Sequence, residues 1–383
     1  MVRGQKPRGL LAGEPVDRRT ILGLGARALL LLGAPTALAA CGQTVPKYVD
    51  RVGYQLDASI GEGSVPLSEL VPLLKSRARA MSMDPVLNQV AAGRMNPLLA
   101  EQTSLGPYDP QTNTRPPANR LVVMSAVEPS SLEPIAAQAM ARGVKIVPFP
   151  RPLHNQTSAI VFDAPAAATA VARQAASWAR EHLGGHGRAL LVLPSSECSS
   201  ENALCSEGPA IEQAWRAALG REAPGLEVTT ADEVVGELGG AEQLAPLARR
   251  RRTQIVLVWS DEVATGLARA LRRDPPAGGP PGGPFVGALG APTVVSAATF
   301  AELERQGPLR LVVAARLREL AEAMVDVPHA LLHGAAPASV TLAPWTLTPH
   351  SAALAAYRTD YAPHPPGATI TYEAVSLNPS AFR

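Results

Sequence analysis

Histidine pairs come closest to a catalytic or metal-binding spacing in this sequence. His329 and His333 lie one helical turn apart, which could hold zinc, and His182 and His186 are a similar distance apart. The glutamate that a metalloprotease helix carries between its two histidines is missing from the first pair. The sequence also has no phosphate-binding Gly-x-x-x-x-Gly-Lys loop, no Gly-x-Ser-x-Gly elbow and no paired spacing of carboxylates. We therefore predict no metal, no cofactor and no enzyme, with a hydrolase of unusual site as the catalytic alternative.

Three cysteines carry the remaining reactive chemistry. Cys198 and Cys205 lie close together in the sequence, and in an oxidising compartment they could form a disulfide. Two unpaired thiols are the alternative, because a disulfide needs a geometry that the sequence does not show. A metal site on these thiols is disfavoured because the segment has no nearby histidine.

Cys41 is preceded by a charged start, an apolar run over Leu24–Leu32 and the small residues of Leu38–Ala40. The paired arginines Arg18-Arg19 resemble a twin-arginine export signal, and Leu-Ala-Ala-Cys resembles a bacterial lipobox. This resemblance implies that residues 1–40 are a signal peptide, and that the lipidated Cys41 becomes the first residue of the mature chain.

An uncleaved membrane helix is the alternative to this signal. Arg27 lies inside the apolar run, and the run is shorter than the roughly 20 residues that a span needs. We predict an extracytoplasmic, periplasmic protein that its N-terminal lipid anchors to the cell membrane.

The amino-acid composition indicates what class of protein the rest of the chain forms. Hydrophobic residues make up 46% and charged residues 18%, with a formal net charge of +2, which indicates a globular protein without attraction to nucleic acid. The run Arg249–Arg252 lies at an expected helix end, where cations are ordinary. No second apolar run approaches membrane-spanning length.

From Arg120 onward, short apolar strands alternate with amphipathic helices. Leu121–Met124 and Ile255–Val258 are almost continuous in Val, Ile, Leu and Met, and Pro165–Leu183 has a helical pattern that Gly184 ends. Strands of this kind, separated by helices, predict α/β architecture with parallel sheets covered on both faces. The prolines and glycines of residues 84–119 interrupt any long hydrophobic pattern, and we expect the structure of this segment to depart from the alternation of strands and helices.

Four blocks together resemble the type I periplasmic binding proteins of sugar ABC transporters, close to the ribose-binding type. The blocks are Leu121–Arg151, Asp163–Gly187, Val258–Gly266 and Val286–Gly290, and the likeness covers roughly Leu121 to Gly334. It implies two α/β lobes, each with a parallel sheet flanked by helices, joined by a hinge of three crossovers. The N-terminal lobe would take residues 41–155 and 317–334, and the C-terminal lobe 156–316 and 335–383.

The resemblance also implies where ligand contacts would lie. The expected ligand-binding residues are Arg151, Ser260, Asp261, Leu289 and Arg316. Arg151 matches an arginine that forks onto sugar hydroxyls, whereas Ser260, Leu289 and Arg316 replace polar residues of other types. A salt bridge in the hinge is the alternative role for each arginine.

Two acidic partners of the usual sugar site are missing, since Pro150 and Leu289 stand where aspartates are expected. The ligand would therefore be a sugar or a sugar-like molecule, anionic or less hydroxylated and bound through the two arginines, or else the site has degenerated. The implied partners are this small molecule, an ABC permease and the membrane, with a monomeric protein. A sensory or structural lipoprotein on the same scaffold is the alternative function.

Overall fold

The computed structural model describes residues 50–57, 67–90, 119–125, 129–154, 158–193, 203–231, 240–275, 280, 282–290, 295, 297–336 and 339–360. All of them belong to the second of two compact units, Tyr48–Arg383. The first unit, Met1–Lys47, contains the expected signal and Cys41 and lies outside the described residues.

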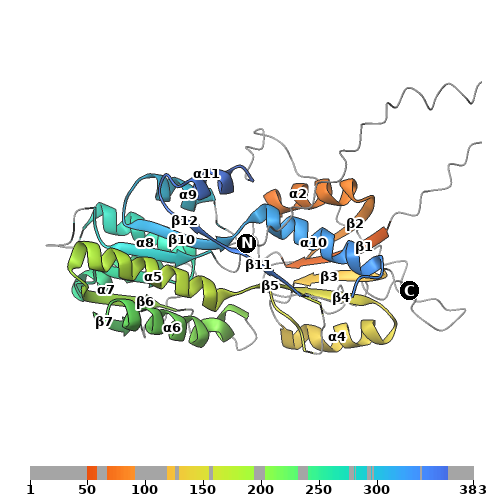
Figure 1. Ribbon diagram of the computed structural model, residues 1–383, viewed down its shortest axis with the longest axis horizontal. Coiled ribbons are helices and arrows are strands. Elements are labelled where there is room, and N and C mark those ends of the chain that lie inside the picture. Colours follow the sequence, from red (N-terminus) through yellow and green to blue (C-terminus); the bar gives the residue numbers. More distant parts are fainter. Residues whose placement is uncertain are drawn as a thin grey trace, which may run out of the picture. The chain divides into compact units, whose positions relative to one another are not determined.

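Four parallel strands form the first sheet, in the order β2 (Met83–Val90), β1 (Asp50–Asp57), β3 (Leu121–Ser125) and β4 (Lys145–Phe149). Among the described residues, helices α2 (Leu67–Ala80) and α10 (Leu317–Leu332) cover one face and α4 (Pro129–Ala141) covers the other (Figure 1). Alternate residues of β3 supply the two faces: Leu121 and Val123 join the core under α2 and α10, and Val122 and Met124 join the one under α4.

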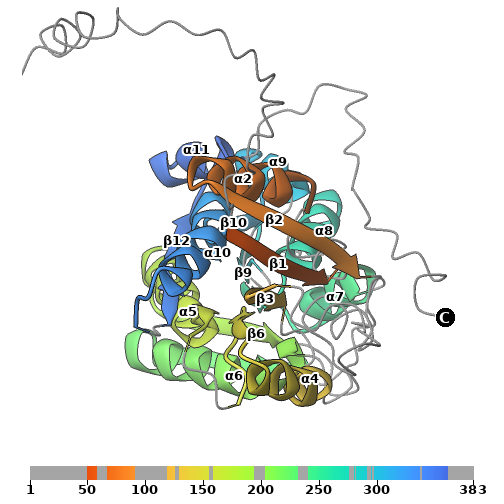
Figure 2. The ribbon, with the colours of Figure 1, turned by 90° about the vertical axis from the view of Figure 1, so that its right-hand side faces the viewer.

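Helices α2 and α10 pack side by side on that face, although they lie far apart in the sequence (Figure 2). Arg77 of α2 donates to both carboxylate oxygens of Asp326 of α10, at 2.8 and 2.7 Å. Under the helices, the hydroxyl of Tyr54 on β1 donates to the carbonyl of Met324 at 3.0 Å. The helix that follows β10 in the sequence is therefore part of the first layered region.

Strand β2 lies where proline and glycine were expected to interrupt regular structure. Pro85 is inside the strand and pairs in register with Val52 of β1. The strand tolerates this proline because β2 is at the edge of the sheet, where one side of the backbone needs no partner. Residues 91–118 lie outside the described part of the chain.

The second sheet has six strands, in the order β12 (Pro344–Leu347), β10 (Leu309–Ala315), β9 (Phe285–Leu289), β8 (Ile255–Val258), β6 (His186–Val192) and β7 (Gly225–Thr230). Helices α5 (Ala164–Leu183) and α6 (Ala203–Glu222) share one core with Ala189 and Leu191 of β6. The opposite core unites Leu190 and Val192 with α7 (Gly240–Arg250), α8 (Asp261–Arg273), α9 (Ala297–Glu304) and α11 (Ala352–Arg358). All pairings are parallel except that of the edge strand β12 with β10.

Three connections join the two layered regions. The first leads from β4 to β5 (Ile160–Phe162), the second from β10 through Arg316 to α10, and the third from α10 to β11 (Val340–Leu342). Strands β5 and β11 pair in parallel with each other. The predicted fold class, two lobes of parallel sheet flanked by helices, is confirmed, with β12 as an antiparallel addition.

Local signals explain where the long helix α5 begins and ends. The carboxylate of Asp163 caps its first turn by accepting from the amide of Ala166 at 2.9 Å. Gly184 ends it with a φ of 63°, a left-handed conformation that glycine adopts without strain. Helix α5 comes directly after β5, at which the first connection ends, and it starts the second layered region.

Candidate functional site

The carboxyl ends of the parallel strands bring polar residues together at one edge of the first sheet. Gln55 lies near the end of β1, Ser125 ends β3, and Arg151 follows β4. Gln55 pairs in register with Met124, and Ser125 with Phe149, so the three strand ends are neighbours. Ligands of open α/β sheets bind at this edge.

Arg151 makes an ion pair with Glu207, at 2.6 Å between Nη2 and Oε1. Glu207 belongs to α6, so the pair joins the first connection to a helix of the second layered region. The two side chains are 17% and 22% exposed, which leaves both within reach of solvent. Burial, with a smaller contribution from Asp163, raises the pKa of the Glu207 carboxyl, although Arg151 lowers it.

Ser125 is a second distinctive group at this edge. It is fully buried, and its Oγ has no hydrogen-bond partner among the described residues. A buried hydroxyl without a partner costs free energy, and such groups are most often found where a ligand or a water completes the hydrogen bonding.

The residues predicted on the second sheet are buried. Leu289 ends β9 and is 2% exposed, and Ser260 precedes α8 and is 7% exposed. The fully buried Asp261 accepts a hydrogen bond from the hydroxyl of Thr299 at 2.7 Å, which ties α8 to α9. Asp261 therefore has a structural partner on a neighbouring helix.

Arg316 lies at the second connection and is bound to a buried carboxylate. Its Nε and Nη2 donate to the two oxygens of Asp360 at 2.8 and 3.1 Å. Arg318 adds a side-chain bond at 3.0 Å and a backbone amide bond at 3.2 Å to the same carboxylate. The guanidinium of Arg316 also lies 4.8 Å from the ring centre of Trp345, whose indole donates to Glu319 at 3.1 Å. We call these five residues the Asp360 clasp.

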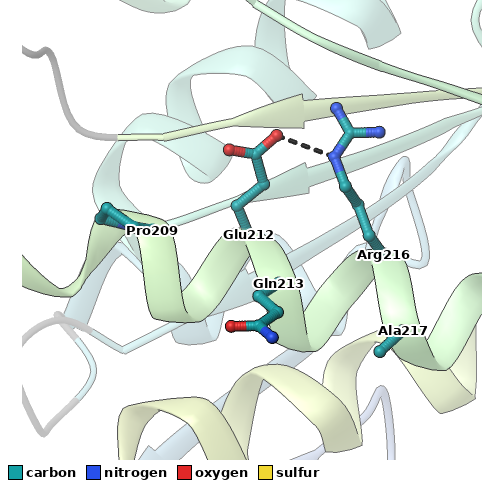
Figure 3. A pocket seen from close by; sticks show the side chains of 5 residues that line it. All are labelled: Pro209, Glu212, Gln213, Arg216 and Ala217. Atoms are coloured by element: carbon teal, nitrogen blue, oxygen red, sulfur yellow. Dashed lines mark hydrogen bonds and ion pairs between the residues drawn. The ribbon is translucent and has the colours of Figure 1, made fainter.

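A hollow of about 520 Å³ lies elsewhere, along α6 (Figure 3). Its lining residues are Pro209, Glu212, Gln213, Arg216 and Ala217. Glu212 and Arg216 pair with each other at 2.8 Å across one helical turn, and both also bond Thr230 of β7. These internal pairs use the charged groups of the hollow, which faces solvent on an exposed helix side.

Several sequence-based predictions fall on parts of the chain that the structure leaves out. Cys41 and Cys198 lie outside the described residues, and for Cys205 only the backbone, in α6, is described. The described part of the chain contains no helix long and apolar enough to cross a membrane. Within that same part, no group of three or more His, Cys, Asp or Glu side chains could hold a metal ion.

Glu207 and Asp360 are the residues that sequence reasoning missed. Neither lies in a recognisable motif, and each meets its arginine from a distant part of the sequence. Only the order of elements offered a signal for Glu207, because the helix that follows β6 must begin near the carboxyl edge of the second sheet.

No family model and no curated protein matches the sequence. Solved structures do match, over most of their length. A sugar-binding protein of a sugar ABC transporter from Bacillus halodurans is 14% identical with a TM-score of 0.61, covering 80% of this chain and 99% of that one. A carbohydrate transporter solute-binding protein from Agrobacterium radiobacter, in complex with D-arabinose, is 12% identical with a TM-score of 0.60, covering 79% and 95%.

A periplasmic ribose ABC transporter protein from Conexibacter woesei gives the same result, at 16% identity and a TM-score of 0.59 over 78% of this chain and 92% of that one. This chain has the type I periplasmic binding protein fold. At these identities the likeness establishes the fold.

Proposed function

We propose that this protein is the substrate-binding lipoprotein of an ABC-type importer. The observation that carries the proposal is the arginine at the carboxyl end of β4, held within reach of solvent on a fold whose solved examples include sugar-binding transport proteins. Its ligand is a sugar or a sugar derivative, bound between the lobes by Arg151 with Ser260 and Leu289 nearby.

The mechanism follows from the three connections. A ligand that contacts both lobes stabilises the closed arrangement, so binding shifts the equilibrium between open and closed forms. The closed form then docks on a membrane permease. The lipid on Cys41 keeps the monomeric receptor outside the cytoplasmic membrane and next to that permease.

Thermal unfolding of the purified full chain against neutral sugars, sugar acids, phosphates and nucleosides tests this function. A ligand at about 100 times its dissociation constant should add about 2.7 kcal/mol to the free energy of unfolding. Arg151→Ala should abolish that gain, and the matched variant Arg188→Ala, which removes an exposed arginine paired with Glu227, should keep it. Full binding by Arg151→Ala would disprove the placement of the site.

A second function is favoured by the Asp360 clasp. The clasp joins the C-terminal segment to the second connection and to the start of α10, and thereby restrains the hinge. A receptor with a restrained hinge suits a sensory or structural lipoprotein whose ligand site has degenerated. Absence of any thermal shift across the panel, together with unchanged uptake in a deletion strain, would favour this function over transport.

A further inference from the structure

The Arg151–Glu207 pair changes the charge that a ligand would meet. A lone guanidinium attracts carboxylates and phosphates, but here a carboxylate already lies 2.6 Å from Nη2. An anion that approached Arg151 would have to displace Glu207 or bind beside a like charge. Both are unfavourable, because charges that are partly removed from water interact more strongly than charges in bulk solvent.

An uncharged, hydroxylated ligand meets no such opposition. A hydroxyl can donate to the carboxylate of Glu207 and accept from the guanidinium of Arg151, so both charged groups keep partners. Glu207 would then supply the acidic partner that Pro150, at the end of β4, does not.

We propose that Glu207 determines the charge selectivity of the binding site, by excluding anions from Arg151 and favouring a neutral polyhydroxyl ligand. The identity of the ligand rests on the proposed function, whereas the exclusion of anions does not. Burial raises the pKa of Glu207 although Arg151 lowers it, and perturbed pKa values of this kind cluster at functional sites.

Matched pairs of probes test the proposal on the full chain and on Glu207→Gln. The probes are inorganic phosphate, glucose with glucuronate, and galactose with galacturonate. We expect phosphate and one or both uronates to bind Glu207→Gln at least roughly tenfold more tightly than the parent chain, measured by calorimetry and by thermal shift. Neutral sugars should lose affinity in the same variant.

Two further variants serve as controls. Adding Arg151→Gln to Glu207→Gln should remove the new anion binding, because the guanidinium to which the anion would bind is gone. Glu212→Gln makes the same chemical change on the same helix, α6, and removes the carboxylate that pairs with Arg216. Arg216, however, is 44% exposed and keeps its bond to Thr230. It should therefore give a much weaker anion response. Glu207→Ser takes the place of Glu207→Gln if the latter fails to fold.

Equal anion binding by the parent chain and Glu207→Gln would overturn the proposal, as would anion binding that survives the loss of Arg151. These outcomes are distinct from failure of the transport function. If no neutral sugar binds the parent chain while phosphate still binds Glu207→Gln, the selectivity role stands and the sugar receptor does not. If a neutral sugar binds the parent chain and the anion response is unchanged in Glu207→Gln, the sugar receptor stands and the selectivity role does not.

Discussion

Arg151 and Arg316 both lie at connections between the lobes, but the carboxylates with which they pair differ in burial and in number of donors. The carboxylate that meets Arg316 has a fully buried side chain and accepts bonds from two arginines and a backbone amide. The carboxylate that meets Arg151 is 22% exposed and, among the described residues, has an ion pair with one guanidinium. Burial and the number of donors therefore separate a structural ion pair from one that a ligand can rearrange.

Asp360→Asn tests the buried ion pairs of Arg316 and Arg318 and has the largest expected effect. Arg316 and Arg318 lose the charge that they share, so we expect the free energy of unfolding to fall by about 2–4 kcal/mol. Urea denaturation measures this loss. The control is Asp274→Asn, whose carboxylate pairs with Arg249 but is 71% exposed. That variant should change stability by less than about 0.5 kcal/mol, and equal losses would contradict the structural role of the Asp360 clasp.

Tyr357→Phe tests whether the Asp360 clasp depends on how helix α11 packs against its neighbours. The buried hydroxyl donates to the carbonyl of Ala315 at 2.6 Å and accepts from the amide of Val295 at 3.2 Å. Its removal breaks both of these buried hydrogen bonds, and we expect a loss of about 1–3 kcal/mol in urea denaturation. Ligand binding should be unchanged. A loss of binding without a loss of stability would place α11 in the binding site instead.

Arg151→Gln and Arg316→Gln compare the two arginines directly. The first should lower the free energy of unfolding by only about 1 kcal/mol, because its pair is partly exposed, and should abolish the ligand response. The second should cost about 2 kcal/mol and leave that response in place. Thermal shift with and without ligand measures both quantities, and the opposite assignment would exchange the roles proposed here.

The pH dependence of stability gives the smallest expected effect. Burial raises the pKa of Glu207, with a further rise from Asp163, and Arg151 only partly opposes it. Such a carboxyl favours the folded state below its unfolded pKa, and this contribution is lost as pH rises through the folded-state pKa. Glu207→Gln should therefore gain melting temperature relative to the parent chain as pH rises from about 4 to 7.

Glu212 provides a control of opposite sign for this titration. Its pKa is lowered, mainly by the hydroxyl of Thr230 and also by Arg216. Glu212→Gln should therefore lose melting temperature relative to the parent chain over the same range of pH. If both variants followed one trend, a general effect of net charge would account for it better than the two local environments.

Local patterns predicted much of the fold. Apolar runs such as Ile255–Val258 form buried strands, and Gly184 ends α5, because these signals depend on neighbours along the chain. The sequence left β2 unpredicted around Pro85, because a proline is excluded from a central strand and tolerated at an edge. Only the order of strands in the sheet shows that β2 is an edge strand.

The candidate site could be predicted only in part. The position of Arg151 after β4 follows from the strand–turn–helix order, and the structure places it at the carboxyl edge of the sheet. Its charge partner could not be predicted, since Glu207 lies on another element in another lobe. The same holds for Arg316, whose partner Asp360 belongs to the C-terminal segment.

By itself, the sequence determined the alternation of strands and helices, and with it the parallel sheets and their carboxyl edges, because hydrophobic periodicity and helix caps act over a few residues. Tertiary structure alone decided which charges meet there. It gave Arg316 a buried carboxylate and Arg151 a partly exposed one. The reason is physical: the energy of an ion pair depends on distance and on access of water, and both are set by the packing of elements that are distant in the chain.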